Sequence, residues 1–513
     1  MNLSWLVPLP VILPLFAAGF ALAMAKRPKA QLASAVTALT VVLGMAVALM
    51  VIAHLEGPQV ANLGGWSAPV GIALVADRLS ALMLVVSAVV LLGVLLYSMA
   101  QGLADGDEGA PVAIYHPTYL VLAAGVSNAF LSGDLFNLFV GFEMLLAASF
   151  VLLTLGGTGA RMRAGSIYVV VSLLSSMMFL AAIALTYAAT GTLSFAQLSL
   201  RIPEIDPGVA LVLQILLLIA FGIKAAVFPL SAWLPDSYPT APAPVTAVFA
   251  GLLTKVGVYA IIRTQTLLFT DGRMDTVLMV AAIVTMIVGI LGAVAQDDIK
   301  RLLSFTLVSH IGYMIFGISL ATQLGLSGSI FYVVHHITVQ TALFLVAGLI
   351  ERRGGTTSLE RLGSLTKAAP ALAVLFFVPA MNLGGIPPMS GFLGKLGLMQ
   401  AGVQHQTPLA YVAVGAGLVA SLLTLYAIIK AWNKAFWQEA PKPLPDTTVP
   451  RGMFLPAAAI AAVGVALAVI AGPLYAYTDA ASRDLRAQTA YVSSVLPDGE
   501  RGEGVSDEVV EEE

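Results

Sequence analysis

The sequence predicts an all-α polytopic membrane protein with about 14 transmembrane helices. Hydrophobic residues make up 59% of the 513 residues and charged residues only 10%, whereas a soluble domain carries about 25% charged residues. Apolar stretches recur about every 25 to 35 residues, and each has the ~20 residues that a helix needs to cross a hydrocarbon core of ~30 Å. Because backbone groups find no water in that core, the spans must be helical.

Fourteen apolar stretches have the length of a span. Their approximate limits are 5–25, 32–54, 78–100, 113–133, 134–156, 166–190, 209–235, 242–266, 276–296, 302–322, 327–350, 370–400, 408–432 and 453–476. The first stretch lacks a basic start and an A-x-A cleavage site, so we interpret it as a retained span and not as a signal peptide. The fourth and fifth spans are separated only by the residues SGD.

The basic residues test this division, because they alternate between the two sides that it predicts. One side holds fifteen of the 25 lysines and arginines: Lys26, Arg27, Lys29, Arg161, Arg163, Lys300, Arg301, Arg352, Arg353, Arg361, Lys367, Lys430, Lys434, Lys442 and Arg451. The other side holds seven: Arg78, Arg201, Arg263, Arg273, Arg483, Arg486 and Arg501. By the positive-inside rule the first side is cytoplasmic, and both termini then face outside.

Several classes of function find no support in the sequence. The absence of cysteine excludes thiolate-held iron–sulfur clusters, cysteine zinc sites and disulfides within the chain. No G-x-S-x-G or H-E-x-x-H motif occurs, and SGFLGKL lacks the spacing and the Ser/Thr of a phosphate loop. His335 and His336 point about 100° apart on a helix and form no two-histidine metal face. We expect no enzyme, cofactor or metal site, and with a net charge of −3 no nucleic-acid partner.

The ionisable residues inside spans are the candidates for function. A central lysine or aspartate costs about 2.5 to 3.5 kcal/mol on insertion scales, so such residues mark ion or proton paths by default. The spans carry Glu143, Lys224, Lys255 and Lys395, and the histidines His310, His335 and His336. Asp134 and Asp236 lie at span ends, where we expect an interface or capping charge. Asp77 and Arg78, at the start of the third span, are also expected at the interface.

Each candidate has a structural alternative. Lys224 could bind carbonyls freed by the nearby prolines, and Lys255 could belong to a salt bridge. Glu143 could neutralise a lysine without moving ions. A histidine that is hydrogen-bonded and structural is as consistent with the sequence as a proton carrier, above all at His310.

Prolines interrupt two of the lysine-bearing spans. FPLSAWLPDSYP follows Lys224, and LGGIPPMSG precedes Lys395. Proline breaks the helical ladder and frees carbonyls. The two broken spans lie five spans apart, and this odd offset makes spans 4–8 and 9–13 an inverted pair. Broken helices at matching positions of two repeats indicate an ion site near the membrane midplane.

Three stretches carry a resemblance to a known family. FNLFVGFEMLLAASFVLL, GIKAAVFPLSAWLPDSYPTAPAPVTAVFAGLLTKVGVYAIIR and NLGGIPPMSGFLGKLG resemble the antiporter-like subunits shared by respiratory complex I and the Mrp cation/proton antiporters. The likeness covers all fourteen spans and is greatest to the D-type subunit of Mrp antiporters. It implies two inverted repeats, over 113–266 and 276–434. These follow N-terminal spans at 1–112 and precede span 14 at 453–476 and an acidic, disordered tail at 477–513.

The resemblance also implies the residues of a proton path. The family's glutamate and lysines of spans 5, 7, 8 and 12 fall on Glu143, Lys224, Lys255 and Lys395. Several relatives have a lysine a few residues after the span-11 histidine, where HHITVQT has Gln340. His335 or His336 is then the expected carrier in that span.

Three functions are compatible with these residues. The first is a proton-translocating subunit of a multisubunit Na⁺ or K⁺/H⁺ antiporter, whose partners are the other Mrp-type subunits and whose location is the plasma membrane of a prokaryote. The second is a proton-pumping subunit of a redox-driven complex related to complex I. The third is a structural membrane subunit without an ion path. The first two share every buried charge, so partner identity separates them.

Overall fold

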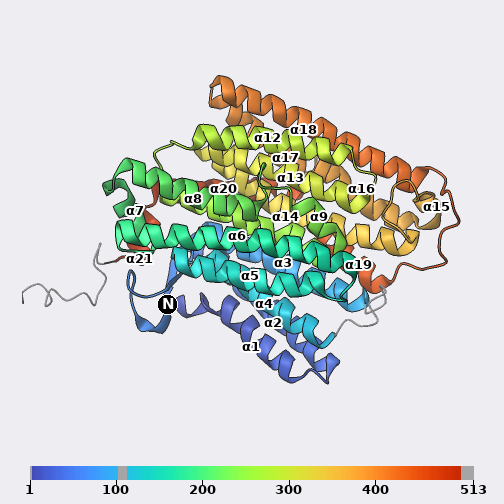
Figure 1. Cartoon of the computed structure of the whole chain (residues 1–513), viewed down its shortest axis with the longest axis horizontal. Coiled ribbons are helices and arrows are strands. Elements are labelled where there is room, and N and C mark those ends of the chain that lie inside the picture. The colour runs from blue at the N-terminus through green and yellow to red at the C-terminus, as the bar shows by residue number, and fades with distance from the viewer. Residues whose placement is uncertain (1–2, 102–111, 498–513) are drawn as a thin grey trace, which may run out of the picture.

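The computed structural model describes residues 3–101 and 112–497, and within them it is a bundle of long helices (Figure 1). Twelve helical segments of the described residues are long and apolar enough to cross a membrane. The other two predicted spans correspond to α4 and to the broken pair α16–α17. The predicted all-α membrane fold is confirmed.

The helices of the spans follow the predicted order closely. In the first half they are α1 (Leu9–Ala23), α2 (Pro28–Leu55), α3 (Arg78–Gln101), α4 (Val112–Leu131), α5 (Leu135–Thr154), α6 (Gly159–Thr190), α8 (Pro207–Ala225) with α9 (Leu234–Ser237), and α10 (Ala243–Val248) with α11 (Thr254–Leu267). In the second half they are α12 (Asp275–Val294), α13 (Ile299–Ser319), α14 (Gln323–Gly354), α16 (Pro370–Gly384) with α17 (Ser390–Gln404), α18 (Pro408–Trp432) and α19 (Arg451–Val469).

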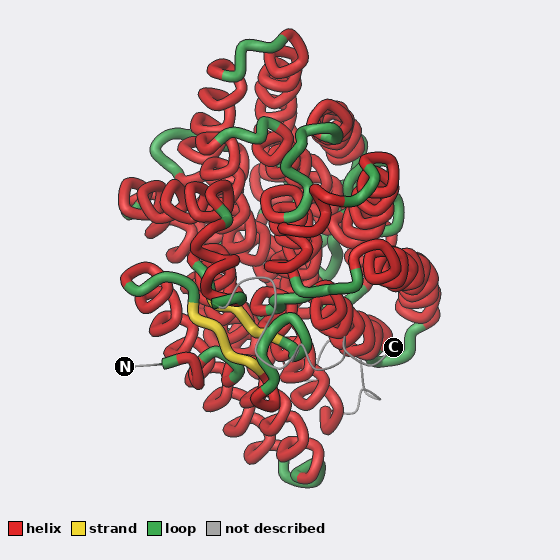
Figure 2. Tube along the Cα trace, turned by 90° about the vertical axis from the view of Figure 1, so that its left-hand side faces the viewer, coloured by secondary structure: helices red, strands yellow, loops and turns green. Residues whose placement is uncertain are grey.

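The loops gather at two ends of the bundle. The terminal face carries the hairpin of β1 (Gln59–Asn62) and β2 (Ala73–Ala76), the short helix α7 (Phe195–Arg201), and the helices α20 (Ala471–Ala487) and α21 (Thr489–Val495). Figure 2 looks onto this end, with the strands in yellow. The opposite end, the basic face, carries the loops around 295–298, 355–369 and 438–450, and the short helix α15 (Leu365–Ala368). Contacts such as those of Asp297 with Lys430 and Lys434 join its loops.

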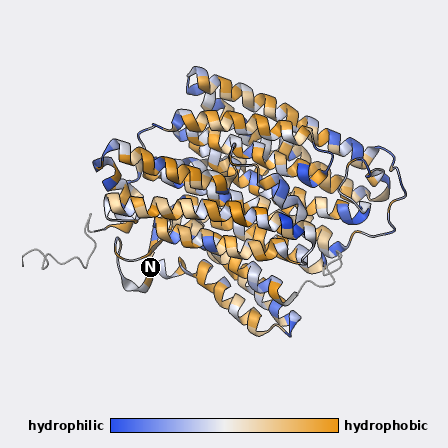
Figure 3. Ribbon diagram, viewed as in Figure 1, coloured by the Kyte–Doolittle hydropathy of each residue, from blue (hydrophilic) through white to orange (hydrophobic). Residues whose placement is uncertain are grey.

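The core lies around α14, which is enclosed by other helices. Every residue from Gly325 to Ile350 is buried, and α10, α11 and α13 are nearly as enclosed. The outer helices instead expose large apolar side chains, such as Leu174 and Met177 of α6 and Leu422 of α18. Figure 3 colours the ribbon by hydropathy and shows the outer helices mostly in orange, the colour of hydrophobic residues. Such a surface suits contact with lipid or with other membrane helices, while ionisable groups in the centre are shielded from both.

The two proline-rich stretches interrupt their helices where predicted. The first helix ends at Ala225, and Ala226 has a left-handed backbone with φ of 59°. The indole nitrogen of Trp233 donates to the carbonyl of Ile223 there, at 3.1 Å. The second break follows Gly384, where Gly385 has φ of 82°. The side chain of Asn382 accepts from the backbone N–H of Gly391 at 2.9 Å, so side chains satisfy both breaks.

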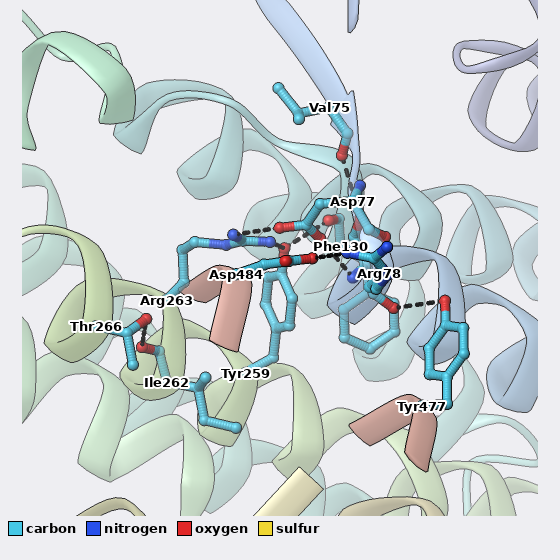
Figure 4. Close-up of polar contacts among 11 residues, drawn as sticks. Val75, Asp77, Arg78, Phe130, Tyr259, Ile262, Arg263, Thr266, Tyr477 and Asp484 are labelled. Atoms are coloured by element: carbon cyan, nitrogen blue, oxygen red, sulfur yellow. Dashed lines mark hydrogen bonds and ion pairs between the residues drawn. The ribbon is translucent and has the colours of Figure 1, made fainter. Parts of the chain in front are cut away.

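Asp77, which we expected at the membrane interface, forms a buried ion pair with Arg263 inside the protein. Arg263 is inside α11 and 2% exposed, and it contacts the carboxylate of Asp77 at 2.6 Å. Its guanidinium also contacts the Tyr259 hydroxyl at 3.0 Å and lies over the ring of Tyr491 at 5.1 Å. Figure 4 shows this buried pair beside the second pair, Arg78 with Asp484. The buried carboxylate of Asp77 explains why the charge of Arg263 is stable inside a helix.

The C-terminal region is also more ordered than predicted. Residues 471–487 and 489–495 form α20 and α21, which pack across the terminal face, whereas we expected a disordered tail from 477. Asp484 pairs with Arg78, and Gln488 donates to the carbonyl of Thr266 at 2.8 Å. Within this tail, the acidic stretch from Asp498 onward lies outside the described residues.

We expect Asp77→Asn to destabilise the protein strongly. Breaking a buried pair leaves the Arg263 charge uncompensated, which costs about 3–5 kcal/mol of unfolding free energy. The matched control is Asp271→Asn, because the Arg273–Asp271 pair is 41% and 44% exposed and such pairs contribute about 0–1 kcal/mol. Thermal unfolding in detergent measures both variants. Equal midpoints for the two would contradict the structural role of the buried pair.

Candidate functional site

Glu143 of α5 and Lys224 of α8 meet at one serine of α6. The hydroxyl of Ser176 donates to the carboxylate of Glu143. The ammonium of Lys224 donates to the same hydroxyl at 3.1 Å and to the carbonyl of Ser172 at 3.3 Å. The carboxylate and the ammonium are thus linked through Ser176.

Lys224 also borders a small cavity. Its volume is about 30 Å³, and its lining includes Phe142, Ser172 and Trp233. A polar cavity needs about 10–15 Å³ to hold a water molecule. The alternative that carbonyls freed by the prolines hold Lys224 is not what the structure shows, because both of its partners come from α6.

Lys255 lies at the start of α11, directly after a π-helical turn at Phe249–Leu253. Its ammonium donates to the carbonyl of Ala250 at 2.5 Å, and the side chain is fully buried. A wider turn leaves carbonyls available, and such turns are frequent at functional sites. Gly257 lets this helix approach α8, since a Cβ there would lie 2.6 Å from the backbone nitrogen of Ala225. Lys255 therefore follows Lys224 across a close helix contact.

Three buried histidines continue the series in α13 and α14. The rings of His310 and His336 have centroids 5.2 Å apart. His310 contacts the Tyr332 hydroxyl at 2.8 Å, and Nδ1 of His335 contacts the Ser390 hydroxyl at 2.9 Å.

The same histidines keep unused ring nitrogens. Nε2 of His335 and both nitrogens of His336 are buried without a hydrogen-bond partner. Thr254 Oγ1 and Gln340 Oε1 are likewise buried without a hydrogen-bond partner. The Gln340 amide nitrogen donates to the carbonyl of Leu303 at 2.7 Å. Buried polar groups ordinarily have a partner, so these unpaired atoms are unusual for a helix core.

Lys395 of α17 points back at the second helix break. Its ammonium donates to the carbonyls of Leu383 and Gly384 at 3.1 and 3.2 Å and to the Ser421 hydroxyl at 3.0 Å. It lies 5.4 Å from the centre of the Tyr313 ring. Gly385 leaves the necessary room, because a Cβ there would meet the lysine Nζ at 3.2 Å.

The buried ionisable groups from Glu143 to Lys395 form what we call the row. Asp134 and Asp236 lie away from it. Asp236 pairs with Arg301 at 3.1 Å and is exposed on the basic face, as expected of a loop charge. Asp134 caps α5 by accepting from the backbone N–H of Asn137 at 2.6 Å. It is only 9% exposed, so it is more buried than the expected interface residue.

Sequence reasoning missed the hydroxyl groups that connect the ionisable residues. The hydroxyls of Ser176 on α6, Ser390 on α17 and Ser421 on α18 each contact a lysine or a histidine of the row, and Ser172 contacts Lys224 through its backbone carbonyl. The spacing of Ser172 and Ser176 by four residues, on one helix face in an apolar span, was the available signal.

The chain is similar to known proteins over nearly its whole length. Residues 132–424 match the family model described as NADH:quinone oxidoreductase/Mrp antiporter, TM. The chain is 38% identical over 495 residues to the D-type subunit of the Na(+)/H(+) antiporter of Alkalihalophilus pseudofirmus, covering 96% of this chain and 99% of that protein.

Two solved structures are similar throughout. A chain of the Mrp complex from Dietzia sp. DQ12-45-1b superposes with a TM-score of 0.89 at 34% identity, covering 96% of this chain and 100% of that one. A chain of the membrane-bound sulfane sulfur reductase, an archaeal respiratory membrane complex, gives a TM-score of 0.86 at 26% identity, covering 97% and 100%.

Proposed function

Because the chain belongs to the NADH:quinone oxidoreductase/Mrp antiporter family, we propose that it is the proton-translocating subunit of a multisubunit Na⁺ or K⁺/H⁺ antiporter. The observation that carries this proposal is the buried row of ionisable groups from Glu143 to Lys395. Such groups cost free energy in a membrane interior, and their presence there indicates an ion or proton path by default. The antiporter relatives and the Mrp-complex structure support this function over a redox-driven pump.

The row relays protons by changing which partners each group meets. Burial disfavours the charged form of a lysine, and a nearby carboxylate favours it. When Ser176 holds Glu143 close to Lys224, the lysine keeps its proton; when they separate, the proton moves on. Lys255, a like charge on the next helix, sets the direction in which it leaves.

The second half of the row completes the path. Water bridging the free nitrogens of His335 and His336 carries the proton between Lys255 and Lys395. Lys395 passes it on beside the carbonyls of the second break. No covalent step is needed. The partners are the other subunits of the antiporter, which supply the cation route.

We place the terminal face outside a prokaryotic plasma membrane, because fifteen basic residues favour the other face. A chain without cysteine makes the test clean. We expect Ser493→Cys on α21 to react with an impermeant maleimide in intact cells, and Glu360→Cys on the basic face to react only after permeabilisation. Both side chains are exposed. Labelling of Glu360→Cys alone in intact cells would reverse the topology.

Affinity purification of the tagged chain from its native membrane tests the assembly. We expect small membrane subunits without iron–sulfur clusters to co-purify, and the complex to exchange Na⁺ or K⁺ for protons in proteoliposomes. The chain purified alone should show no exchange, since it needs the cation route of its partners. Iron–sulfur subunits in the purified complex would favour the redox-driven pump, and robust exchange by the single chain would contradict the need for partners.

A further inference from the structure

A cavity of about 620 Å³ opens at the terminal face, away from the buried row. Its lining includes Val70 of the hairpin loop, Tyr187 at the end of α6, Arg201 of α7, and two bridged residues, Asp134 and Ser194. Polar and apolar side chains both line the cavity, which is large enough to hold water.

One side-chain oxygen of each bridged residue is buried without a hydrogen-bond partner. Asp134 is 9% exposed and Ser194 is 4% exposed. One carboxylate oxygen of Asp134 accepts from Asn137, but its Oδ2 has no hydrogen-bond partner, and neither has the hydroxyl of Ser194. The capping role of Asp134 therefore accounts for only one of its two oxygens.

The second half of the chain contains the same motif in a satisfied form. Asp298 caps α13 and is bridged to Ser358, as Asp134 caps α5 and is bridged to Ser194. The free oxygen of Asp298 accepts from the Thr357 hydroxyl. The residue before Ser194 is Leu193, which offers no hydroxyl. A purely structural motif would be completed in both places, so the first copy leaves an oxygen available.

We propose that Asp134, which lines the cavity, is a proton-binding site of the terminal face, and that its buried free carboxyl oxygen binds a proton supplied by water in the cavity. A buried carboxyl oxygen without a donor is costly as an anion, and protonation removes that cost. A metal cation is the less fitting ligand, because Arg201 lines the same cavity and no group of three or more acidic or histidine ligands occurs among the described residues.

The electrostatic surroundings agree with this assignment. Burial raises the pKa of Asp134 to about 6, against backbone hydrogen bonds from Asn137 and Phe136 that lower it. The other titratable or charged groups nearby are Arg201, Tyr187 and Tyr491, and the last lies over Arg263 of the pair with Asp77. The carboxyl then takes up a proton below about pH 6 and releases it above.

A polar cluster leads inward from Asp134. Asn137 contacts the Ser132 hydroxyl at 3.0 Å and the Asn128 side chain at 3.2 Å, between α4 and α5. Asp134 also starts the helix that carries Glu143, nine residues or about 13 Å further along. A role of Asp134 as the port of the relay rests on the proposed function, whereas proton binding at Asp134 does not.

Infrared difference spectra of the complex in lipid, recorded across pH 5–8, test the site directly. We expect a protonated-carboxyl band that titrates near pH 6, that is lost in Asp134→Asn and that persists in the matched control Asp298→Asn. Asparagine is as good a helix cap as aspartate, so the fold should survive. The same titrating band in Asp134→Asn, or no titrating carboxyl in the wild type, would overturn the proposal.

A second variant tests whether the missing hydrogen bond at Asp134 raises its titration midpoint. Leu193→Thr places at Asp134 the hydroxyl that Thr357 supplies to Asp298, and a hydrogen bond to the anion should lower the midpoint by about one pH unit. An unchanged midpoint would contradict the idea that the missing hydrogen bond to Oδ2 sets the pKa of Asp134. The titration is repeated in Na⁺ and in choline, where we expect equal midpoints; a midpoint that falls with Na⁺ would assign the site to a metal cation instead. A wild-type complex that shows this titration of Asp134 but no cation/proton exchange would count against the proposed function alone.

Discussion

Glu143→Gln and Lys224→Met each lower cation-driven proton movement by about a hundredfold or more, the scale at which a positioned proton donor or acceptor contributes to a proton transfer. Glutamine removes the charge that holds the proton on Lys224, and methionine removes the carrier itself. The measurement is the response of a pH dye in everted vesicles, normalised to the amount of assembled complex. A near wild-type rate in Glu143→Gln would reduce this residue to a neutralising charge.

Milder changes at the same site separate charge from geometry. Glu143→Asp should keep part of the activity, because the charge stays and its reach shortens by only ~1.5 Å, against the 4–6 Å over which an opposite charge acts. Ser176→Ala should slow exchange, since Ser176 contacts both Glu143 and Lys224. Ser166→Ala, on the exposed side of the same helix, is the matched control and should not. Equal rates for the two serine variants would contradict the linking role of Ser176.

Lys395→Met stops exchange to a similar extent. The carbonyls of Leu383 and Gly384 and the Ser421 hydroxyl surround a group that must gain and lose a proton. Methionine retains the bulk and the apolar stem, so a lysine that only fills space would tolerate it. Arginine keeps its proton at any accessible pH, and Lys395→Arg should therefore be nearly as inactive.

Lys395→Glu should restore part of the rate, because a carboxylate can also take up and release a proton. The assay is again exchange in everted vesicles normalised to assembled complex. Wild-type rates in both the methionine and the arginine variants would show that Lys395 carries no protons and that the relay leaves the membrane elsewhere.

The sequence predicted the helices well because hydrophobicity and length decide where a chain can cross a membrane. The breaks after Ala225 and Gly384 followed from proline chemistry, which is local. Buried lysines stood out because their cost in hydrocarbon is large. Each of these signals is read from neighbouring residues alone.

The missed features depend on residues that are distant in sequence. Asp77 and Arg263 are 186 positions apart, and only the tertiary fold brings the residue that follows β2 next to α11. The link through Ser176 and the turn before Lys255 likewise follow from how helices meet. The C-terminal helices were hidden by polar residues, such as Asp484, that find partners on the terminal face. The free oxygen of Asp134 is visible only beside its satisfied counterpart, Asp298.

The central claim is that one continuous row joins the two broken helices, and Lys255 is its middle member. The most direct measurement is the exchange rate of Lys255→Met in the assembled complex, with Lys434→Met as the matched control. Lys434 pairs with Asp297 on the basic face, outside the row. A continuous row predicts that Lys255→Met loses exchange as fully as the variants at Lys224 and Lys395, while Lys434→Met keeps the wild-type rate. Wild-type exchange in Lys255→Met would contradict a path that crosses the centre of the protein.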